Sequence, residues 1–183
     1  MKDLFKSFIF GLLNDVPYFI YIILFFVLLF FSIILFLTFG KGKTFRLLLS
    51  RFALGEYIFL IYCSTVLFRT TKQYQEPNIT PFWKYKAYDN MGNMYLLPEI
   101  IMNLTAFIPF GYLLSMSFDN LKFWQLLLIG FLVSISIESL QFFYKLGMAE
   151  FDDVFNNTLG VGIGYSLYRL IYFVLNKIRR FLI

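Results

Sequence analysis

Long apolar runs separated by short charged segments dominate the pattern of this chain. A helix of about 20 apolar residues crosses the roughly 30 Å of hydrocarbon in a bilayer. Runs of this kind lie at residues 18–39, 52–69, 100–118, 123–144 and 154–175. The pattern therefore predicts an all-α polytopic membrane protein, in which residues 1–183 form one integral membrane domain, a small bundle of about five transmembrane helices.

Prolines modify two parts of this expectation. Pro109 lies inside the third predicted span, where the missing backbone N–H predicts a kink. Pro77, Pro81 and Pro98 interrupt the polar and aromatic stretch 70–97, which predicts a long loop with an interfacial turn around residues 79–83. Before the first span, apolar residues at helical spacing predict a short helix along the membrane surface within residues 1–16.

Composition and charge agree with a membrane protein and exclude several other classes. Apolar residues make up 60% of the chain and charged residues 15%, whereas soluble domains carry about a quarter charged residues. The net charge of +5 comes from basic residues that flank apolar runs, which indicates cytoplasmic anchors and no nucleic-acid partner. Placing Lys41–Arg51 and Lys177–Arg180 in the cytoplasm puts the N-terminus outside, the C-terminus inside, and loops 70–97 and 145–153 outside.

The reactive residue types are few. The chain has no histidine and one cysteine, Cys63, which lies in an apolar run. An intramolecular disulfide, a histidine-based triad and histidine-ligated zinc are therefore excluded. We expect no cofactor and no metal.

The fourth predicted helix carries a polar stripe. Residues at spacings of four, four, three and four share one helix face and are small or polar, whereas the other faces are Leu, Phe and Ile. Because unpaired polar groups are costly in lipid, this face is expected to meet protein or water. The stripe consists of Gly130, Ser134, Glu138, Gln141 and Lys145.

The fifth predicted helix carries a second stripe. Asp153 and Asn157 are followed by Gly160 and Gly164, a GxxxG pair that allows two helices to pack closely. Gly130 on the fourth helix is a further packing candidate. Asp152 and Asp153 lie where the fifth helix is expected to begin, and their interpretation as helix caps stands beside a functional one.

These stripes predict a polar cluster near the outer end of the bundle. A buried carboxylate at Glu138 needs a cation or a proton, and we expect Arg69 as its first partner and Lys145 as its second. The ligand-binding candidates are Arg69, Asn103, Glu138, Gln141, Asp152, Asp153 and Asn157.

Four ordered segments of the chain resemble the VanZ-like family. They are Asn78-Ile-Thr-Pro-Phe82, Asn103-Leu-Thr-Ala-Phe-Ile-Pro-Phe-Gly111, Glu138-Ser-Leu-Gln141 and Asp152-Asp153 with Asn157-Thr-Leu-Gly160, and the resemblance covers about residues 55–175. It implies a bacterial multi-pass protein of the plasma membrane that acts on susceptibility to glycopeptides of the teicoplanin type. It implies no particular reaction.

The segment before the aspartate pair departs from the family pattern. Many relatives have a Gly-Arg-x-x-Asp arrangement there, whereas this chain has Gly147-Met-Ala-Glu150-Phe-Asp152. An acidic Glu150 does not suit a shared anion-binding role for this loop.

Three functional interpretations follow from these residues. In the first, an outward polar pocket binds a lipid-linked peptidoglycan precursor or a lipophilic glycopeptide antibiotic, with Arg69 and Lys145 meeting phosphate or carboxylate. In the second, the chain is an intramembrane enzyme of lipid or cell-wall metabolism, with Glu138 and Asp153 as acid and base, or with Glu150, Asp152 and Asp153 as metal ligands. In the third, the polar groups only hold helices together.

Overall fold

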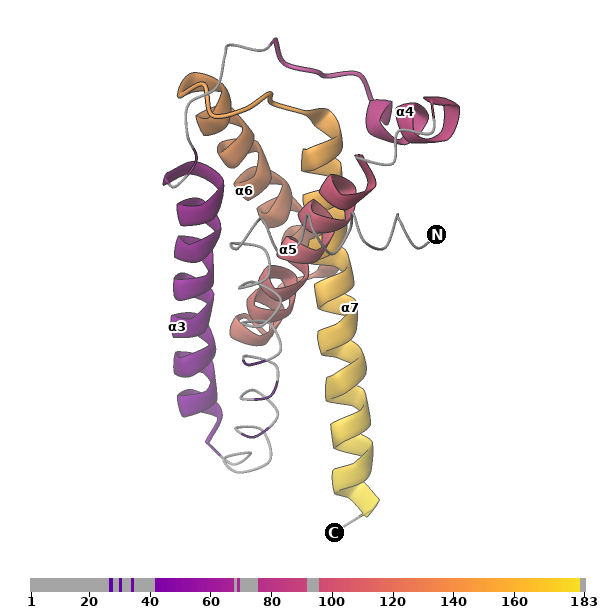
Figure 1. Cartoon of the computed structure of the whole chain (residues 1–183). Helices are drawn as coiled ribbons and strands as arrows, with labels where there is room; N and C mark the ends of the chain where they lie inside the picture. The colour runs from indigo at the N-terminus through magenta and orange to yellow at the C-terminus, as the bar shows by residue number, and fades with distance from the viewer. Residues whose placement is uncertain are drawn as a thin grey trace.

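The computed structural model describes residues 27, 30, 34, 42–67, 69, 76–91 and 96–181. Their elements are α3 (Lys43–Tyr62), the π-helical turn η1 (Cys63–Leu67), α4 (Trp83–Met91), α5 (Leu96–Ser117), α6 (Phe123–Phe143) and α7 (Phe151–Phe181) (Figure 1). Four helices of the described residues are long and apolar enough to cross a membrane, at Phe45–Val66, Leu96–Ser117, Phe123–Phe143 and Phe151–Arg180. The predicted all-α membrane fold is thereby confirmed. The predicted span 18–39, save three isolated positions, and the predicted surface helix lie outside the described residues.

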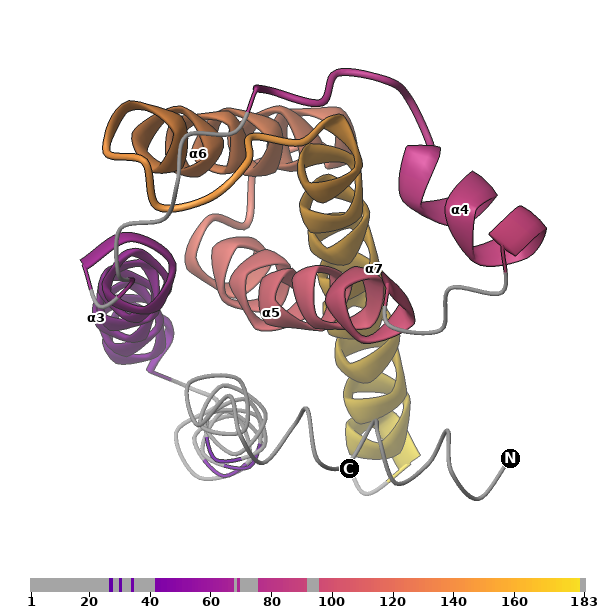
Figure 2. The same cartoon turned by 45° about the horizontal axis from the view of Figure 1, so that its top comes forward.

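The long helices alternate in direction. The ends of η1 and α6 and the beginnings of α5 and α7 lie at the same end of the bundle, and α4 lies to one side of that end, on the side of α7 (Figures 1 and 2). We call that end the α4 end. The alternation brings residues that are distant in sequence, in the segments around 69, 84, 103, 140 and 153, to one place.

Helix α7 packs against α5 with its glycines at the crossing. A Cβ atom at Gly160 would lie 2.3 Å from the Leu104 carbonyl oxygen, and one at Gly164 would lie 2.1 Å from the Ile108 carbonyl oxygen. Both distances are far below van der Waals contact, so the two backbones approach closely only because glycine has no side chain. The GxxxG pair of the sequence therefore lies in the interface between α5 and α7.

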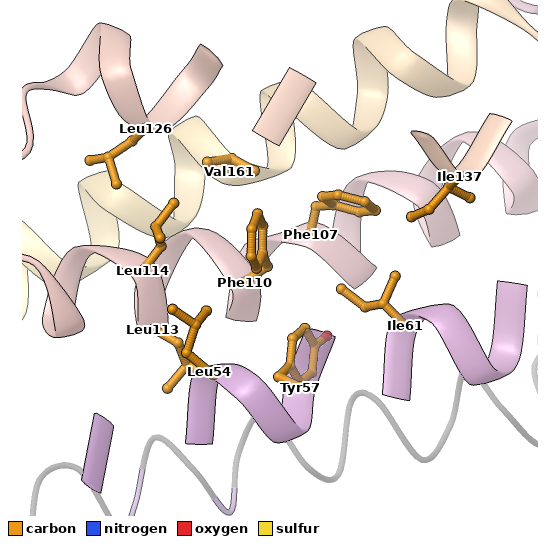
Figure 3. Packing of buried hydrophobic residues seen from close by; sticks show 10 residues of the cluster. All are labelled: Leu54, Tyr57, Ile61, Phe107, Phe110, Leu113, Leu114, Leu126, Ile137 and Val161. Carbon is orange, nitrogen blue, oxygen red and sulfur yellow. The ribbon is translucent and has the colours of Figure 1, made fainter. Parts of the chain in front are cut away.

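A buried apolar cluster joins the four long helices (Figure 3). Tyr57 of α3 is fully buried in this cluster, and its hydroxyl donates a hydrogen bond of 2.7 Å to the Ala106 carbonyl oxygen. That oxygen lies in the turn before Pro109, which is inside α5 as the sequence predicts. The kink at Pro109 stays a prediction. The cluster consists of Leu54, Tyr57, Ile61, Phe107, Phe110, Leu113, Leu114, Leu126, Ile137 and Val161.

Helix α3 begins at Lys43, well before the predicted limit at residue 52. Arg46 forms an ion pair of 3.9 Å with Asp119, and the Arg51 Nε donates to the Ser117 carbonyl oxygen at 3.4 Å. These contacts hold the cations against the connection between α5 and α6. The basic residues that were expected to precede the helix can therefore be part of its first turns.

The predicted loop 70–97 contains a helix that the sequence analysis did not predict. Helix α4 is short, polar and aromatic, and its N-terminal backbone N–H groups are bonded by a side chain from α7. Helix α7 is also longer than the predicted range 154–175, since it begins at Phe151 and continues to Phe181. A distant cap leaves no signal in the local sequence, which is why α4 was missed.

Candidate functional site

Polar side chains gather at the α4 end of the bundle in two adjoining groups. One is a cluster of charges around Lys84, and the other is a small polar cavity between η1, α5, α6 and α7. Asp153, in the first turn of α7, belongs to both. The two groups therefore form one continuous polar site.

The lysine cluster consists of Lys84 and three carboxylates. The Lys84 side chain is 2% exposed, and its Nζ lies 2.6 Å from Glu150 Oε2, 2.7 Å from Asp153 Oδ1 and 3.2 Å from Glu99 Oε2. The ammonium group donates a hydrogen bond to Asp153 and forms ion pairs with all three carboxylates, so its charge is fully compensated. Burial alone would lower the pKa of Lys84, but the charges and hydrogen bonds of Asp153 and Glu150 outweigh burial and raise the pKa above its ordinary value.

Glu150 connects the lysine cluster to the cavity. Its backbone N–H donates a hydrogen bond of 3.1 Å to Glu138 Oε2, while its own carboxylate meets Lys84. Burial and the nearby charge of Asp153 raise the pKa of Glu150 to about 7, and Lys84 opposes that rise only in part. The acidic residue that departs from the family pattern is therefore a partner of Lys84 in this chain.

Asp152 fixes the beginning of α4. Its two carboxylate oxygens accept hydrogen bonds from the backbone N–H groups of Phe82 and Lys84 at 2.6 and 2.8 Å. Asp152 was expected to cap its own helix. It does lie in the first turn of α7, but its carboxylate caps the N-terminus of α4 instead. It is fully buried and does not line the cavity.

The segment before α4 runs beside the segment before α7. The Asn78 N–H donates to the Ala149 carbonyl oxygen at 2.9 Å, and the Phe151 N–H donates to the Asn78 carbonyl oxygen at 3.1 Å. Phe82, which has a positive φ of 59°, packs its ring edge-to-face on Phe151 and Phe155. These contacts bring α4 and Lys84 to the start of α7.

The cavity brings together six of the seven ligand-binding candidates. Its volume is about 30 Å³, which is room for one or two water-sized guests. The remaining lining comes from η1 and from apolar residues of α3, α5 and α6. The six candidates in the lining are Arg69, Asn103, Glu138, Gln141, Asp153 and Asn157.

The polar stripe of α6 faces the interior, except at its last member. Gly130, Ser134, Glu138 and Gln141 are buried, whereas Lys145 lies beyond the end of α6 and is exposed. Lys145 has a positive φ of 55°, so the chain turns there and helical spacing no longer applies. The stripe therefore ends at Gln141.

Hydrogen bonds hold the carboxamides of the cavity. Gln141 Nε2 donates to the Thr65 carbonyl oxygen at 3.0 Å, and Asn157 Nδ2 donates to Ser134 Oγ at 2.8 Å. The Asn103 amide lies against the Asp153 carboxylate. The side chains from four elements are thus fixed around one small space.

The expected ion pairs of Glu138 do not form. Neither Arg69 nor Lys145 lies within 4 Å of its carboxylate in an ion pair among the described residues, and the Glu150 N–H bonds it instead. Arg69 attracts Glu138 across the cavity without touching it. Within the part of the chain that the structure describes, Arg69 has neither an ion pair nor a hydrogen bond.

The metal version of the enzyme hypothesis is not supported by the geometry. Glu150 and Asp153 surround Lys84, and Asp152 bonds to the backbone of α4. Across the described ranges, no group of three or more Asp, Glu, Cys or His side chains is arranged to hold a metal ion. The Lys84 ammonium takes the place that a divalent cation would need.

A second hollow has a different character. A groove of about 550 Å³ runs along α6 and α7 and is lined mainly by Phe, Leu and Ile side chains. Its two hydroxyl groups, on Thr158 and Ser166, donate to carbonyl oxygens of their own helix. In a membrane this groove faces acyl chains, and it offers no polar chemistry.

Sequence analysis missed Lys84 and Glu99. Lys84 lies two residues beyond the segment Asn78–Phe82, within the predicted loop 70–97. A lysine in a polar loop has no periodic pattern that reveals burial. The proximity of that segment to Lys84 is the one signal that could have pointed to it.

Taken together, the four apolar helices and the buried polar site define a multi-pass helical membrane protein. The family model described as VanZ/LLP1 matches residues 18–172, and the chain belongs to this family. The protein named "Protein VanZ" of Enterococcus faecium is 34% identical over 93 residues, which is 51% of this chain and 52% of that protein. The match thus spans about half the length of this relative. No solved structure matches the chain.

Proposed function

We propose that this protein lowers susceptibility to teicoplanin-type glycopeptides by binding an anionic group at the α4 end of the bundle. The ligand is a lipid-linked cell-wall component or the lipophilic antibiotic itself. The observation that carries the proposal is Arg69, a half-buried cation at the cavity with no ion pair among the described residues.

Arg69 has the chemistry that an anionic ligand needs. A guanidinium group binds phosphate or carboxylate through two parallel hydrogen bonds, and such bonds are stronger at a partly desolvated site. Lys84 is not available for this task because three carboxylates surround it. Arg69 is therefore the cation of this site that meets the ligand.

The size of the cavity restricts where the ligand binds. A volume of about 30 Å³ is too small for a phosphate with its lipid or for a glycopeptide. The ligand therefore binds at the mouth of the cavity, beside Arg69 and the loop that carries the exposed Lys145. Carboxamides in the cavity help to hold the site in shape.

The charge distribution supports an outward orientation for this site. Arg179 and Arg180 lie in the last turn of α7, at the end of the bundle opposite to α4. Basic clusters of this kind remain in the cytoplasm. The α4 end then faces outward across the plasma membrane, where cell-wall precursors and glycopeptides meet.

The test compares Arg69→Gln with Lys86→Gln in cells that express the protein. Both changes remove one positive charge, but Lys86 is an exposed residue of α4 outside the cavity. We expect Arg69→Gln to lose most of the protection against teicoplanin, because the ligand's anion loses its bidentate partner.

Lys86→Gln should protect as the unchanged protein does, and immunoblots of membranes should show equal amounts of all three proteins. Full protection by a well-expressed Arg69→Gln variant would remove Arg69, and with it the proposed binding site, from the account.

A second proposal is an intramembrane enzyme of lipid or cell-wall metabolism. The supporting observation is that Glu138 and Asp153 line the same cavity, where one could act as acid and the other as base. Incubation of the purified protein with labelled undecaprenyl-linked substrates tests this. Turnover that Glu138→Gln abolishes would support an enzyme, and no turnover by the unchanged protein disposes of it.

A further inference from the structure

Two carboxamides of the cavity lining, those of Gln141 and Asn157, have their N–H groups bonded to protein oxygens. Gln141 Nε2 bonds to the Thr65 carbonyl oxygen, and Asn157 Nδ2 bonds to Ser134 Oγ. A carboxamide carries its oxygen on the opposite edge from its nitrogen. With the nitrogens engaged elsewhere, what the two side chains can offer a guest in the cavity is an acceptor oxygen.

The hydroxyl groups of η1 are also committed as donors. Ser64 Oγ and Thr65 Oγ1 both donate to the Ile61 carbonyl oxygen, at 3.0 and 2.7 Å. Both residues line the cavity, so their remaining lone pairs are acceptors as well. They come from a π-helical turn, a rare irregularity that is frequent at functional sites.

One acceptor oxygen of the lining is buried without a partner. Asn157 is 4% exposed, and its Oδ1 has no hydrogen-bond partner among the described residues. A buried oxygen in this condition is unfavourable unless a donor or a cation meets it. The lining is therefore incomplete with protein atoms alone.

The charge of the site favours a cation over a neutral guest. Four carboxylates, those of Glu99, Glu138, Glu150 and Asp153, surround two cations, Lys84 and Arg69. The Lys84 ammonium is saturated, and Arg69 does not form an ion pair with Glu138. Glu138 therefore has no cation in contact among the described residues, and a small cation in the cavity would compensate its carboxylate charge.

We infer that this cavity binds one monovalent cation of the size of sodium. Its ligands are oxygens of Glu138, Asp153, Gln141 and Asn157, and hard cations prefer oxygen ligands of this kind. The volume of about 30 Å³ admits a single small ion. Asp153 is already paired with Lys84, so Glu138 leaves one carboxylate charge for a single positive ion. The described residues hold no group of three or more Asp, Glu, Cys or His side chains arranged for a divalent ion.

The cation has a consequence for the proposed ligand, although the inference does not depend on that proposal. A positive ion beside Glu138 compensates the carboxylate that Arg69 otherwise attracts. Arg69 then stays free for an anion at the mouth of the cavity.

The test measures thermal unfolding of the purified full-length protein in sodium, potassium and choline chloride at equal ionic strength. With sodium at a hundred times its Kd, we expect Tm to lie roughly 5–10 °C above its value in choline. The matched variants are Glu138→Gln, which should lose the sodium response, and Glu56→Gln, which is the same chemical change at an exposed position of α3 outside the cavity and should keep it.

Direct binding of radioactive sodium, displaced by unlabelled sodium, provides the second readout and does not require the variants to be stable. Equal Tm values in sodium and choline, together with no bound radioactive sodium, would show that the cavity holds water only and would overturn the inference. A sodium response that persists unchanged in Glu138→Gln would overturn it too, because the ion would then bind elsewhere. Neither result bears on the Arg69 susceptibility test.

Discussion

At the scale of single residues, Lys84 and Arg69 are two cations at the same end of the bundle with opposite surroundings. Lys84 is buried among three carboxylates, whereas Arg69 has no ion pair in the part of the chain that is described. A saturated cation holds structure together, and an unsaturated one can bind a ligand. This difference assigns a positioning role to Lys84 and the binding role to Arg69.

Replacing Lys84 tests its positioning role. Lys84→Met keeps the length and the apolar stem of the side chain but leaves three carboxylates facing one another. We expect the variant to lose about 3 kcal/mol of stability, since removing one partner from a buried ion pair strands the others. Lys86→Met on the same helix is exposed and should change little. Thermal unfolding in detergent compares them, and equal stability of the two variants would contradict the positioning role.

The same scale shows which site residues sequence analysis can find. Glu138, Gln141 and Asn157 lie on helices, where spacing reveals the face that each residue shares. Lys84 and Glu99 become site residues only because the chain folds back at α4. The residues around them in the sequence carry no pattern that predicts this fold-back. Sequence analysis also could not predict that Glu138 and Arg69 form no ion pair, because the group that bonds Glu138 instead is the backbone N–H of Glu150.

At the scale of elements, the crossing of α5 and α7 decides how closely the bundle packs. The glycines of α7 lie against carbonyl oxygens of α5, which a side chain cannot displace. This close approach brings Asp153 and Asn157 of α7 next to Asn103 of α5. The packing of two apolar helices thus sets the geometry of the polar site.

Two glycine substitutions separate packing from helix propensity. Gly164→Ala places a Cβ 2.1 Å from the Ile108 carbonyl oxygen, so we expect a loss of about 2 kcal/mol or more. Gly55→Ala meets nothing within 4 Å, so the better helix propensity of alanine should stabilise α3 by up to about 1 kcal/mol. Unfolding of both variants by heat gives the comparison. A neutral or stabilising Gly164→Ala would show that the two helices do not pack so closely.

Sequence analysis predicts some helices of the bundle and misses or misplaces others. Long apolar runs define α5, α6 and α7 because lipid imposes a fixed length on a spanning helix. The start of α3 was placed too late, because Arg46 and Arg51 were expected to lie before the helix, whereas the connection after α5 holds them within it. Helix α4 was missed because the residue that caps it, Asp152, belongs to α7.

At the scale of the whole molecule, the alternating helices collect polar residues at one end and leave apolar faces along the sides. The family match over residues 18–172 places this arrangement among the VanZ/LLP1 proteins. The anionic ligand and the outward orientation of the α4 end are our proposals. The proposed ligand has one physical requirement, which is a cation at the cavity mouth that the described residues do not neutralise.

Native mass spectrometry of the purified protein tests that requirement most directly. Wild-type protein released gently from membranes should carry phosphate-bearing lipid, and Arg69→Gln should retain at least about tenfold less, since a charge-assisted hydrogen bond contributes about 1.5 kcal/mol or more. Lys86→Gln should retain as much as the wild type. Equal retention by Arg69→Gln would contradict the account, and so would a wild-type protein that carries no such lipid and also binds no added teicoplanin.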